Sequence, residues 1–332
     1  MIPKISIIIP TFNSEGFIRN ALNSIKEQEF TNFEVLIVDA GSIDNTRKIS
    51  ENYDNRFKFM ELKDSKQGEA RNLGISLSKG EFIMFLDSDD SLSNKTVLKD
   101  CLESINEDKN VDFYNFDITF EQNDKLVRRI GSNINGCIQG RSEILSLGLC
   151  GKEVHTIPWN KIYRSDFIKS NHISFPSLKE QEDMVFIIHC CMKANKIKFS
   201  NNNIVTADVR DESLSRTMTS VNVGCCLDVF NYTEKLFKKE GLDDMFDYDF
   251  KLYKMRTASY IILMALYRIS CNSDFMRSIN IIKKSKVMES NLSFKAFKKL
   301  KLSTIIGIII VKITPLLKIL RLFKRFKIIK GY

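Results

Sequence analysis

Apolar residues near the start of the chain form short continuous runs of the kind that makes buried strands. These runs are rich in β-branched and aromatic residues and are bounded by polar or turn-forming residues. They predict strands over residues 5–9, 33–38, 56–62 and 81–86. Because these strands are apolar on both faces, they indicate a parallel sheet that is covered by helices on each side.

The segments between these runs carry apolar residues at helical spacing instead. This pattern predicts one helix after the first strand, with Ser14 as its N-cap, and another helix just before the fourth strand. The residues that define the two patterns are Ile18, Ala21, Leu22 and Ile25, and then Ala70, Leu73, Ile75 and Leu77. The alternation of strands and helices predicts a Rossmann-like α/β fold with a mostly parallel sheet.

Polar loops follow the first, second and fourth predicted strands. Their sequences are PTFNSEG at 10–16, DAGSIDNT at 39–46 and DSDD at 87–90. Ligands of open parallel sheets bind beyond the carboxyl ends of the strands. We therefore expect a binding site at the edge where the three loops meet. A dinucleotide cofactor or a P-loop is not indicated, because no GxGxxG follows the first strand and no GxxxxGK[ST] occurs.

Three acids, Asp87, Asp89 and Asp90, directly follow a buried strand. Like charges repel at this spacing, and burying an unpaired carboxylate costs several kcal/mol. The acids either face water in a turn and cap the next helix, or they bind a cation. Mg²⁺ and Mn²⁺ bind through one or two carboxylates together with substrate phosphate oxygens. The position of the acids at the ligand edge of the sheet favours a metal site.

The polar loops and the segments around them resemble family 2 glycosyltransferases of the GT-A fold, in order and in spacing. The matching segments are IIIPTFNSEGFIRNALNSI, FEVLIVDAGSIDNT and GEARNLGISLSKGEFIMFLDSDD, and the similarity continues in WNKIY (159–163) and EQEDMVF (180–186). The resemblance implies a GT-A fold and a nucleotide-sugar donor. It also implies Asp87 and Asp89 as a metal-binding DxD pair, with Asp90 beside them and Mn²⁺ or Mg²⁺ as the cofactor.

Donor contacts are implied at the polar loops and at the helix before the DxD pair. They comprise Pro10, Thr11, Phe12, Asn13, Asp39, Arg71, Asp87 and Ser88. The residues alone leave Arg71 a second role, a surface salt bridge with Glu69 or Glu81. Many relatives carry two acids after the second strand, whereas Ala40 follows Asp39 here. The donor base therefore stays open between a UDP-sugar, which is favoured, and a GDP- or dTDP-sugar.

A further helix is predicted to begin with the acids Glu180, Glu182 and Asp183. Its apolar residues at helical spacing are Met184, Ile187, Ile188 and Cys191. Acids favour the positive end of a helix dipole, so capping alone would explain them. The resemblance instead implies Asp183 as the base that deprotonates the acceptor, with Glu182 as its neighbour. Because no second carboxylate is placed as a nucleophile, we expect direct displacement with inversion.

The acceptor side is implied at Trp159, Asn160 and Lys161. An aromatic face suits stacking on a sugar, and the two polar side chains can reach hydroxyl or phosphate groups. The alternative for Trp159, the only tryptophan in the chain, is a half-buried core position. Arg210 follows a strand predicted over 198–207. The segment around it resembles a loop that faces donor or acceptor phosphates in relatives.

The C-terminal residues 295–332 contain eleven Lys or Arg and no Asp or Glu, so the formal net charge of +9 is concentrated there. After Pro315, apolar and basic residues separate onto two sides of a helix. A basic amphipathic helix is typical of an interfacial membrane anchor, and packing on its own domain is the alternative. The longest apolar run, 305–311, is too short to span a bilayer. We expect a cytoplasmic protein bound peripherally to anionic lipid on the inner face of the membrane.

The sequence as a whole predicts a GT-A catalytic domain over 1–218, with a nucleotide-sugar half (1–92) and an acceptor-side half (93–218). A helical extension follows over 219–294, and then the basic tail.

The expected activity is the transfer of a hexosyl or N-acetylhexosaminyl group to a saccharide in surface polysaccharide, O-antigen or capsule synthesis. A polyprenyl-diphosphate-linked saccharide is the expected acceptor. The alternatives are a sugar nucleotidyltransferase and an inactive, membrane-tethered nucleotide-sugar-binding protein. A nucleic-acid partner is not indicated, because basic and aromatic residues do not interleave. Eight cysteines without a CxxC pattern indicate reduced thiols.

Overall fold

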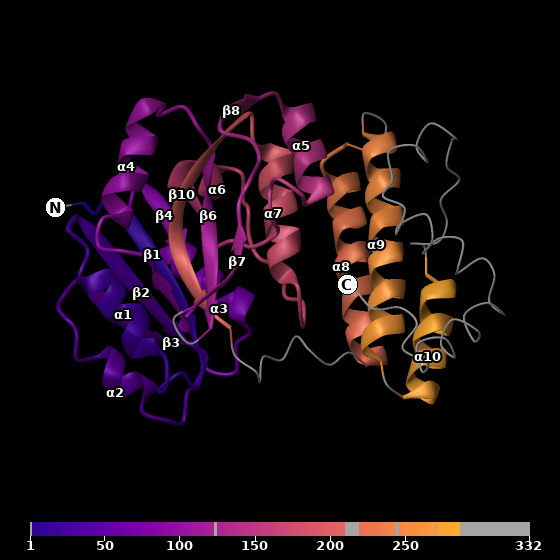
Figure 1. Cartoon of the computed structure of the whole chain (residues 1–332), viewed down its shortest axis with the longest axis horizontal. Helices are drawn as coiled ribbons and strands as arrows, with labels where there is room; N and C mark the ends of the chain where they lie inside the picture. The colour runs from indigo at the N-terminus through magenta and orange to yellow at the C-terminus, as the bar shows by residue number, and fades with distance from the viewer. Residues whose placement is uncertain (1, 123–124, 210–218, 243–245, 270, 286–332) are drawn as a thin grey trace. The chain divides into compact units, whose positions relative to one another are not determined.

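The computed structural model describes residues 2–122, 125–209, 219–242, 246–269 and 271–285 (Figure 1). The chain divides into two compact units, Met1–Asp211 and Glu212–Tyr332. The sequence predicts the corresponding boundary after residue 218. The two units are described separately below.

The first half of the sheet confirms the predicted parallel strands. Its strands are β1 (Ile5–Thr11), β2 (Phe33–Asp39), β3 (Phe57–Glu61) and β4 (Phe82–Phe85). They lie in the order β3-β2-β1-β4 and pair in parallel throughout. Every residue of β1, β2 and β4 is buried, as expected for strands covered on both faces.

The second half of the sheet mixes strand directions. Its strands are β5 (Asp90–Leu92), β6 (Phe113–Gln122), β7 (Lys125–Ile130), β8 (Gly136–Gln139), β9 (Lys161–Arg164) and β10 (Lys196–Asp208). The strand predicted over 198–207 is confirmed as part of β10, which runs parallel to β6 and antiparallel to β5. β9 joins the two halves, because it pairs in antiparallel fashion with both β4 and β6.

The helices of this unit are α1 (Ile18–Lys26), α2 (Thr46–Ser50), α3 (Gln67–Leu77), α4 (Val97–Glu107), α5 (Arg141–Cys150), α6 (Ser165–Ser170) and α7 (Glu182–Lys193). The predicted apolar face of α1 is buried in full. α3 packs on β1, where a Cβ at Gly74 would collide with Ile8. α5 lies beside α7 (Figure 1).

The prediction that Ser14 caps α1 is wrong. The helix begins after Phe17, and the Ser14 carbonyl accepts hydrogen bonds from the backbone N–H groups of Phe17 and Ile18. The Ser14 hydroxyl instead contacts the Phe12 carbonyl and lies 2.9 Å from the hydroxyl of Ser88. This hydroxyl is therefore part of the loops at the sheet edge rather than of the helix end.

An aromatic cluster connects β4 to α7. The ring of Phe85, near the end of β4, packs edge-on against Phe175 and Phe186, and these two rings stack on one another at 3.9 Å. α7 is buried on nearly all sides from Val185 to Met192. The contact places the start of α7 beside the residues that follow β4.

The second unit contains α8 (Ser220–Lys239), α9 (Asp247–Arg268) and α10 (Asn272–Lys283), which confirms the predicted helical extension. Ser220 at the start of α8 donates a hydrogen bond to Asp274 of α10. Within the ranges that the structure describes, no helix has both the length and the apolar character needed to cross a membrane. The predicted basic tail lies outside the described residues.

Candidate active site

The three polar loops lie together at the carboxyl edge of the sheet. The backbone N–H of Asn13 donates to the Ser42 hydroxyl at 2.8 Å, and the Asn13 side-chain oxygen accepts from the N–H of Ile43 at 3.0 Å. The hydroxyl contact between Ser14 and Ser88 joins the loop after β1 to the loop after β4. This meeting point is the one that the strand pattern predicts.

On the predicted donor side, Asp39 is only 1% exposed. Its carboxylate accepts hydrogen bonds from the backbone N–H of Gly41 at 3.2 Å and of Ser42 at 2.8 Å, and it also accepts one from the Ser42 hydroxyl. Asp39 therefore shapes the loop after β2. Pro10 is buried in β1, whereas the ring of Phe12 is 58% exposed.

The hydroxyl of Thr11 is buried at the end of β1. Among the described residues it has no hydrogen-bond partner. A buried hydroxyl without a partner is costly, so a ligand that bonds to it would remove that cost.

The acids after β4 form a compact cluster. Asp87, Asp89 and Asp90 each offer one carboxylate oxygen, and these atoms lie within 4.8 Å of one another. Asp89 is exposed, Asp87 is partly buried, and Asp90 is buried at the start of β5. Three carboxylates this close repel one another, and a set of oxygen ligands fits a hard cation such as Mg²⁺ or Mn²⁺.

Arg71 connects this cluster to α7. Its side chain is fully buried, and its Nη2 donates to Asp87 Oδ1 at 2.8 Å. Its Nη1 donates to Asp183 Oδ1 at 2.6 Å and to Glu182 Oε1 at 3.3 Å. One guanidinium thus joins the residue predicted to bind metal to the residue predicted to act as base.

The alternative prediction for Arg71, a surface salt bridge with Glu69 or Glu81, is wrong. Glu69 accepts a hydrogen bond from the Ser177 hydroxyl, and Glu81 pairs with Lys4. Sequence proximity suggested these acids, but α3 directs Arg71 inward to acids that are more than a hundred positions away.

The environment of Asp183 perturbs its proton affinity. Burial raises the pKa of Asp183 to about 7; Arg71 opposes this effect, while Glu182 and Asp87 add to it. The side chain keeps 28% of its surface exposed, so it remains accessible from solvent. A carboxyl group with a pKa near neutrality is a suitable proton acceptor.

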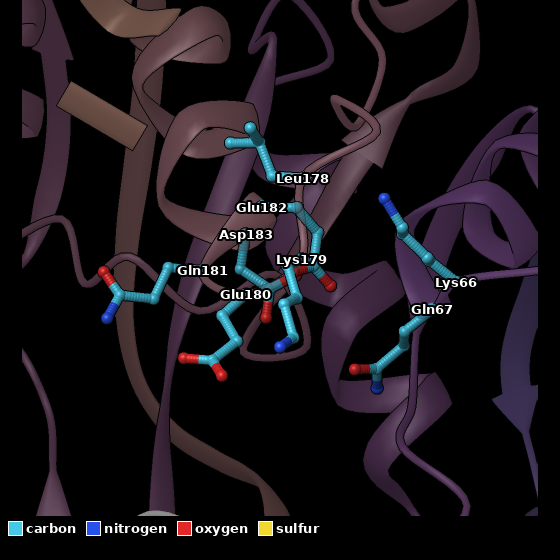
Figure 2. A pocket seen from close by; sticks show the side chains of 8 residues that line it. All are labelled: Lys66, Gln67, Leu178, Lys179, Glu180, Gln181, Glu182 and Asp183. Atoms are coloured by element: carbon cyan, nitrogen blue, oxygen red, sulfur yellow. The ribbon is translucent and has the colours of Figure 1, made fainter. Parts of the chain in front are cut away.

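A pocket of about 380 Å³ opens beside Asp183. Figure 2 shows Lys66 and Gln67, at the start of α3, on one side, and residues 178–183 on the other. Gln67 also donates to Asp87 Oδ1 at 3.3 Å, which links the pocket to the acid cluster. The sequence prediction missed Gln67, although it precedes Arg71 by four residues and so lies on the same face of the helix.

The structure places Trp159, Asn160 and Lys161 below the surface. Trp159 is 7% exposed and packs edge-on against Phe120. Asn160 donates to the carbonyl of Phe116, while the ammonium of Lys161 donates to three oxygen atoms within 2.8 Å. Burial lowers the pKa of Lys161 to about 7. None of the three lines the pocket described above, and Arg210 lies outside the described residues.

The mixed α/β sheet, with an acid cluster where β4 ends, defines a GT-A fold. A family model described as glycosyl transferase family 2 matches residues 6–171, half of the 332-residue chain. The chain belongs to this family.

Two named relatives and one solved structure refine the comparison. The poly(ribitol-phosphate) beta-N-acetylglucosaminyltransferase TarS of Staphylococcus aureus (strain MW2) is 35% identical over 206 residues, which cover 58% of this chain and 33% of TarS. The GalNAc(5)-diNAcBac-PP-undecaprenol beta-1,3-glucosyltransferase of Campylobacter jejuni is 38% identical over 95 residues, 27% of this chain and 31% of that protein. The matched segments thus span about a third of these curated relatives.

The crystal structure of S. aureus TarS 1–349 in complex with UDP-GlcNAc superimposes with a TM-score of 0.66 and 27% identity. The match covers 83% of this chain and 79% of that one. The structural match therefore extends well beyond the half of this chain that the family model matches.

Proposed function

We propose that this protein transfers a hexosyl or N-acetylhexosaminyl group from a UDP-sugar to a saccharide, with inversion and with Mn²⁺ or Mg²⁺. The observation that carries the proposal is the ion-pair cluster around Arg71, in which Asp87 and Asp183 contact the same guanidinium. The UDP-GlcNAc complex of TarS supports a UDP-sugar as the donor.

The donor would bind over the loops after β1, β2 and β4. Asp87 and Asp89, with Asp90 beside them, would hold the cation. When bound, a divalent cation supplies Lewis-acid stabilisation of the leaving diphosphate. The unpaired hydroxyl of Thr11 would bond to the donor, and the exposed ring of Phe12 would stack against its base.

The acceptor would bind in the pocket beside Asp183. The hydroxyl oxygen of the acceptor forms a bond to the anomeric carbon of the donor sugar, while the bond from that carbon to the diphosphate oxygen breaks. The hydroxyl proton passes to the Asp183 carboxylate, which acts as general base. A single displacement on the face opposite the leaving group inverts the anomeric configuration.

The acceptor class and the location are inferred from relatives and from the tail. The names of the two relatives describe transfer to a poly(ribitol-phosphate) and to an undecaprenol-linked saccharide. A lipid-linked saccharide in surface polysaccharide synthesis is the acceptor that we propose. The basic tail would hold the enzyme on the cytoplasmic face of the membrane through anionic lipid.

Incubation of the full chain with Mn²⁺, a lipid-linked saccharide acceptor and a panel of UDP-, GDP- and dTDP-sugars tests this function. We expect a UDP-sugar to give UDP and a glycoside of inverted configuration, detected by NMR of the anomeric proton. A parallel incubation with UTP and a sugar 1-phosphate that yields a UDP-sugar and inorganic diphosphate would indicate a sugar nucleotidyltransferase instead. Donor binding without transfer or hydrolysis under any condition would favour an inactive binding protein.

A further inference from the structure

Arg71 sits where the resemblance implies a contact with the nucleotide, but its surroundings differ from those of a phosphate-binding arginine. The side chain has no exposed surface. Both of its terminal nitrogens already donate to carboxylates, Nη2 to Asp87 and Nη1 to Asp183 and Glu182. The remaining N–H groups, at Nε and on Nη2, are enclosed with the rest of the side chain, so a donor phosphate could reach them only if the surrounding side chains moved.

The aromatic cluster fixes the guanidinium from another side. Arg71 Cζ lies 5.2 Å from the centre of the Phe175 ring, and this ring stacks on Phe186 of α7 with an interplanar angle of 2°. Arg71 Nε is buried and, among the described residues, has no hydrogen-bond partner. Rotation of the guanidinium toward a ligand would give up both the stacking and the ion pairs.

The charge balance also argues for an internal role. One positive charge faces three carboxylates, so the cluster holds an excess of negative charge. An anionic diphosphate would meet this excess, and not a free cation, if it approached Arg71.

We propose that Arg71 is a positioning residue that locks the metal-binding Asp87 and the base Asp183 into one rigid unit, and that it does not contact the donor. Asp87 Oδ1 and Asp183 Oδ1 are both committed to the guanidinium. Each carboxylate therefore keeps its second oxygen for its own task, one toward a cation and one toward the acceptor. This assignment rests on the proposed transferase function.

The Arg71→Lys variant tests the assignment, because lysine keeps the charge and loses the planar fork. We expect the Kd for UDP in EDTA, measured by calorimetry, to stay within about twofold of the wild type. The Kd for Mn²⁺ alone, measured by electron paramagnetic resonance, should rise about tenfold, and kcat should fall about 100-fold with little change in donor KM. A tenfold weaker Kd for UDP in EDTA with an unchanged Kd for Mn²⁺ would overturn the proposal and restore a phosphate contact.

Arg164→Lys is the matched control, since Arg164 also joins two acids, Asp112 and Asp166, but lies outside the site. It should leave all three measurements unchanged. If Arg71→Lys does not fold, Phe175→Leu provides the second test, because it removes the ring beneath the guanidinium and changes no charge.

We expect Phe175→Leu to bind UDP in EDTA like the wild type while its kcat falls and its Kd for Mn²⁺ rises, each about threefold. Wild-type values of kcat and of the Kd for Mn²⁺ in a folded Phe175→Leu protein would also contradict the assignment. Failure of the proposed function looks different, because the wild type itself would then show no Mn²⁺-dependent binding of UDP-sugars.

Discussion

Replacing Asp183 by Asn should lower turnover while it raises the stability of the metal-free protein. Asn keeps the shape of the side chain but cannot accept the acceptor proton, so turnover should fall by about 10²–10⁴-fold. Donor affinity should stay close to the wild-type value, because Asp183 lines the pocket that we propose for the acceptor and reaches the donor side only through Arg71. A loss in kcat without a loss in donor Kd is the expected signature.

Without metal, the Asp183→Asn protein should also be more stable than the wild type above neutral pH. Burial raises the pKa of Asp183 from its usual 3.8 to about 7, so the folded protein keeps a proton that the unfolded chain releases. The wild type therefore loses stability as pH rises from about 4 to about 7, and the cost is complete above pH 7. The full difference between these two pKa values corresponds to about 4 kcal/mol in the free energy of unfolding. Because 28% of the side chain is exposed and solvent screens its charge, we expect Asp183→Asn to raise the free energy of unfolding by about 1–2 kcal/mol.

Urea unfolding at pH 5 and pH 8 measures this effect, with Glu182→Gln as the matched control from the same end of α7. The stability advantage of Asp183→Asn over the wild type should grow between these two pH values. Glu182→Gln should keep most of the turnover, because Glu182 is the weaker partner of Arg71 at 3.3 Å. An Asp183→Asn protein with wild-type turnover would refute the assignment of the base, and an advantage that shrinks with rising pH would refute the charge argument.

Three further changes test the rest of the site. Asp89→Asn should abolish Mn²⁺-dependent UDP binding in calorimetry and leave the fold intact, because these acids repel one another without a cation; normal turnover with Mn²⁺ would contradict this. Lys161→Ala should destabilise the protein by about 3 kcal/mol in urea, since one buried and two partly buried oxygens lose their donor, and a changed acceptor KM at full stability would restore its predicted acceptor role. Deletion of residues 312–332 should abolish co-sedimentation with anionic vesicles and spare activity on a soluble acceptor; unchanged vesicle binding would sink the membrane role of the tail.

The strand pattern was sufficient to locate the edge of the sheet that carries the site. Buried strands in a doubly covered sheet need apolar residues on both faces, so 5–9, 33–38 and 81–86 stand out without any tertiary information. Their carboxyl ends must meet at one edge because they run in parallel. The acids after β4 could therefore be placed at a ligand site before any contact was known.

The partners of individual polar side chains could not be predicted in the same way. Arg71 meets acids more than a hundred positions later because the aromatic contact between β4 and α7 brings them together, and no local spacing encodes this. The polar side chains of Asn160 and Lys161 suggested ligand contacts, yet backbone carbonyls in the core satisfy them. Burial decides such cases, and it depends on packing that a single sequence does not display.

The charge distribution gives a physical reason why donor binding should depend on a divalent cation. The loops after β1 and β2 are joined by hydrogen bonds within the protein, so the surface that we propose for the nucleoside is held in place by the chain itself. The diphosphate, in contrast, would approach Asp87, Asp89 and Asp90, and the single charge of Arg71 is already shared among three carboxylates. Repulsion between a dianionic group and these acids weakens binding, and a cation between them removes this repulsion. Nucleoside recognition and diphosphate recognition are thus separable, and uridine affinity should be insensitive to EDTA where UDP affinity is not.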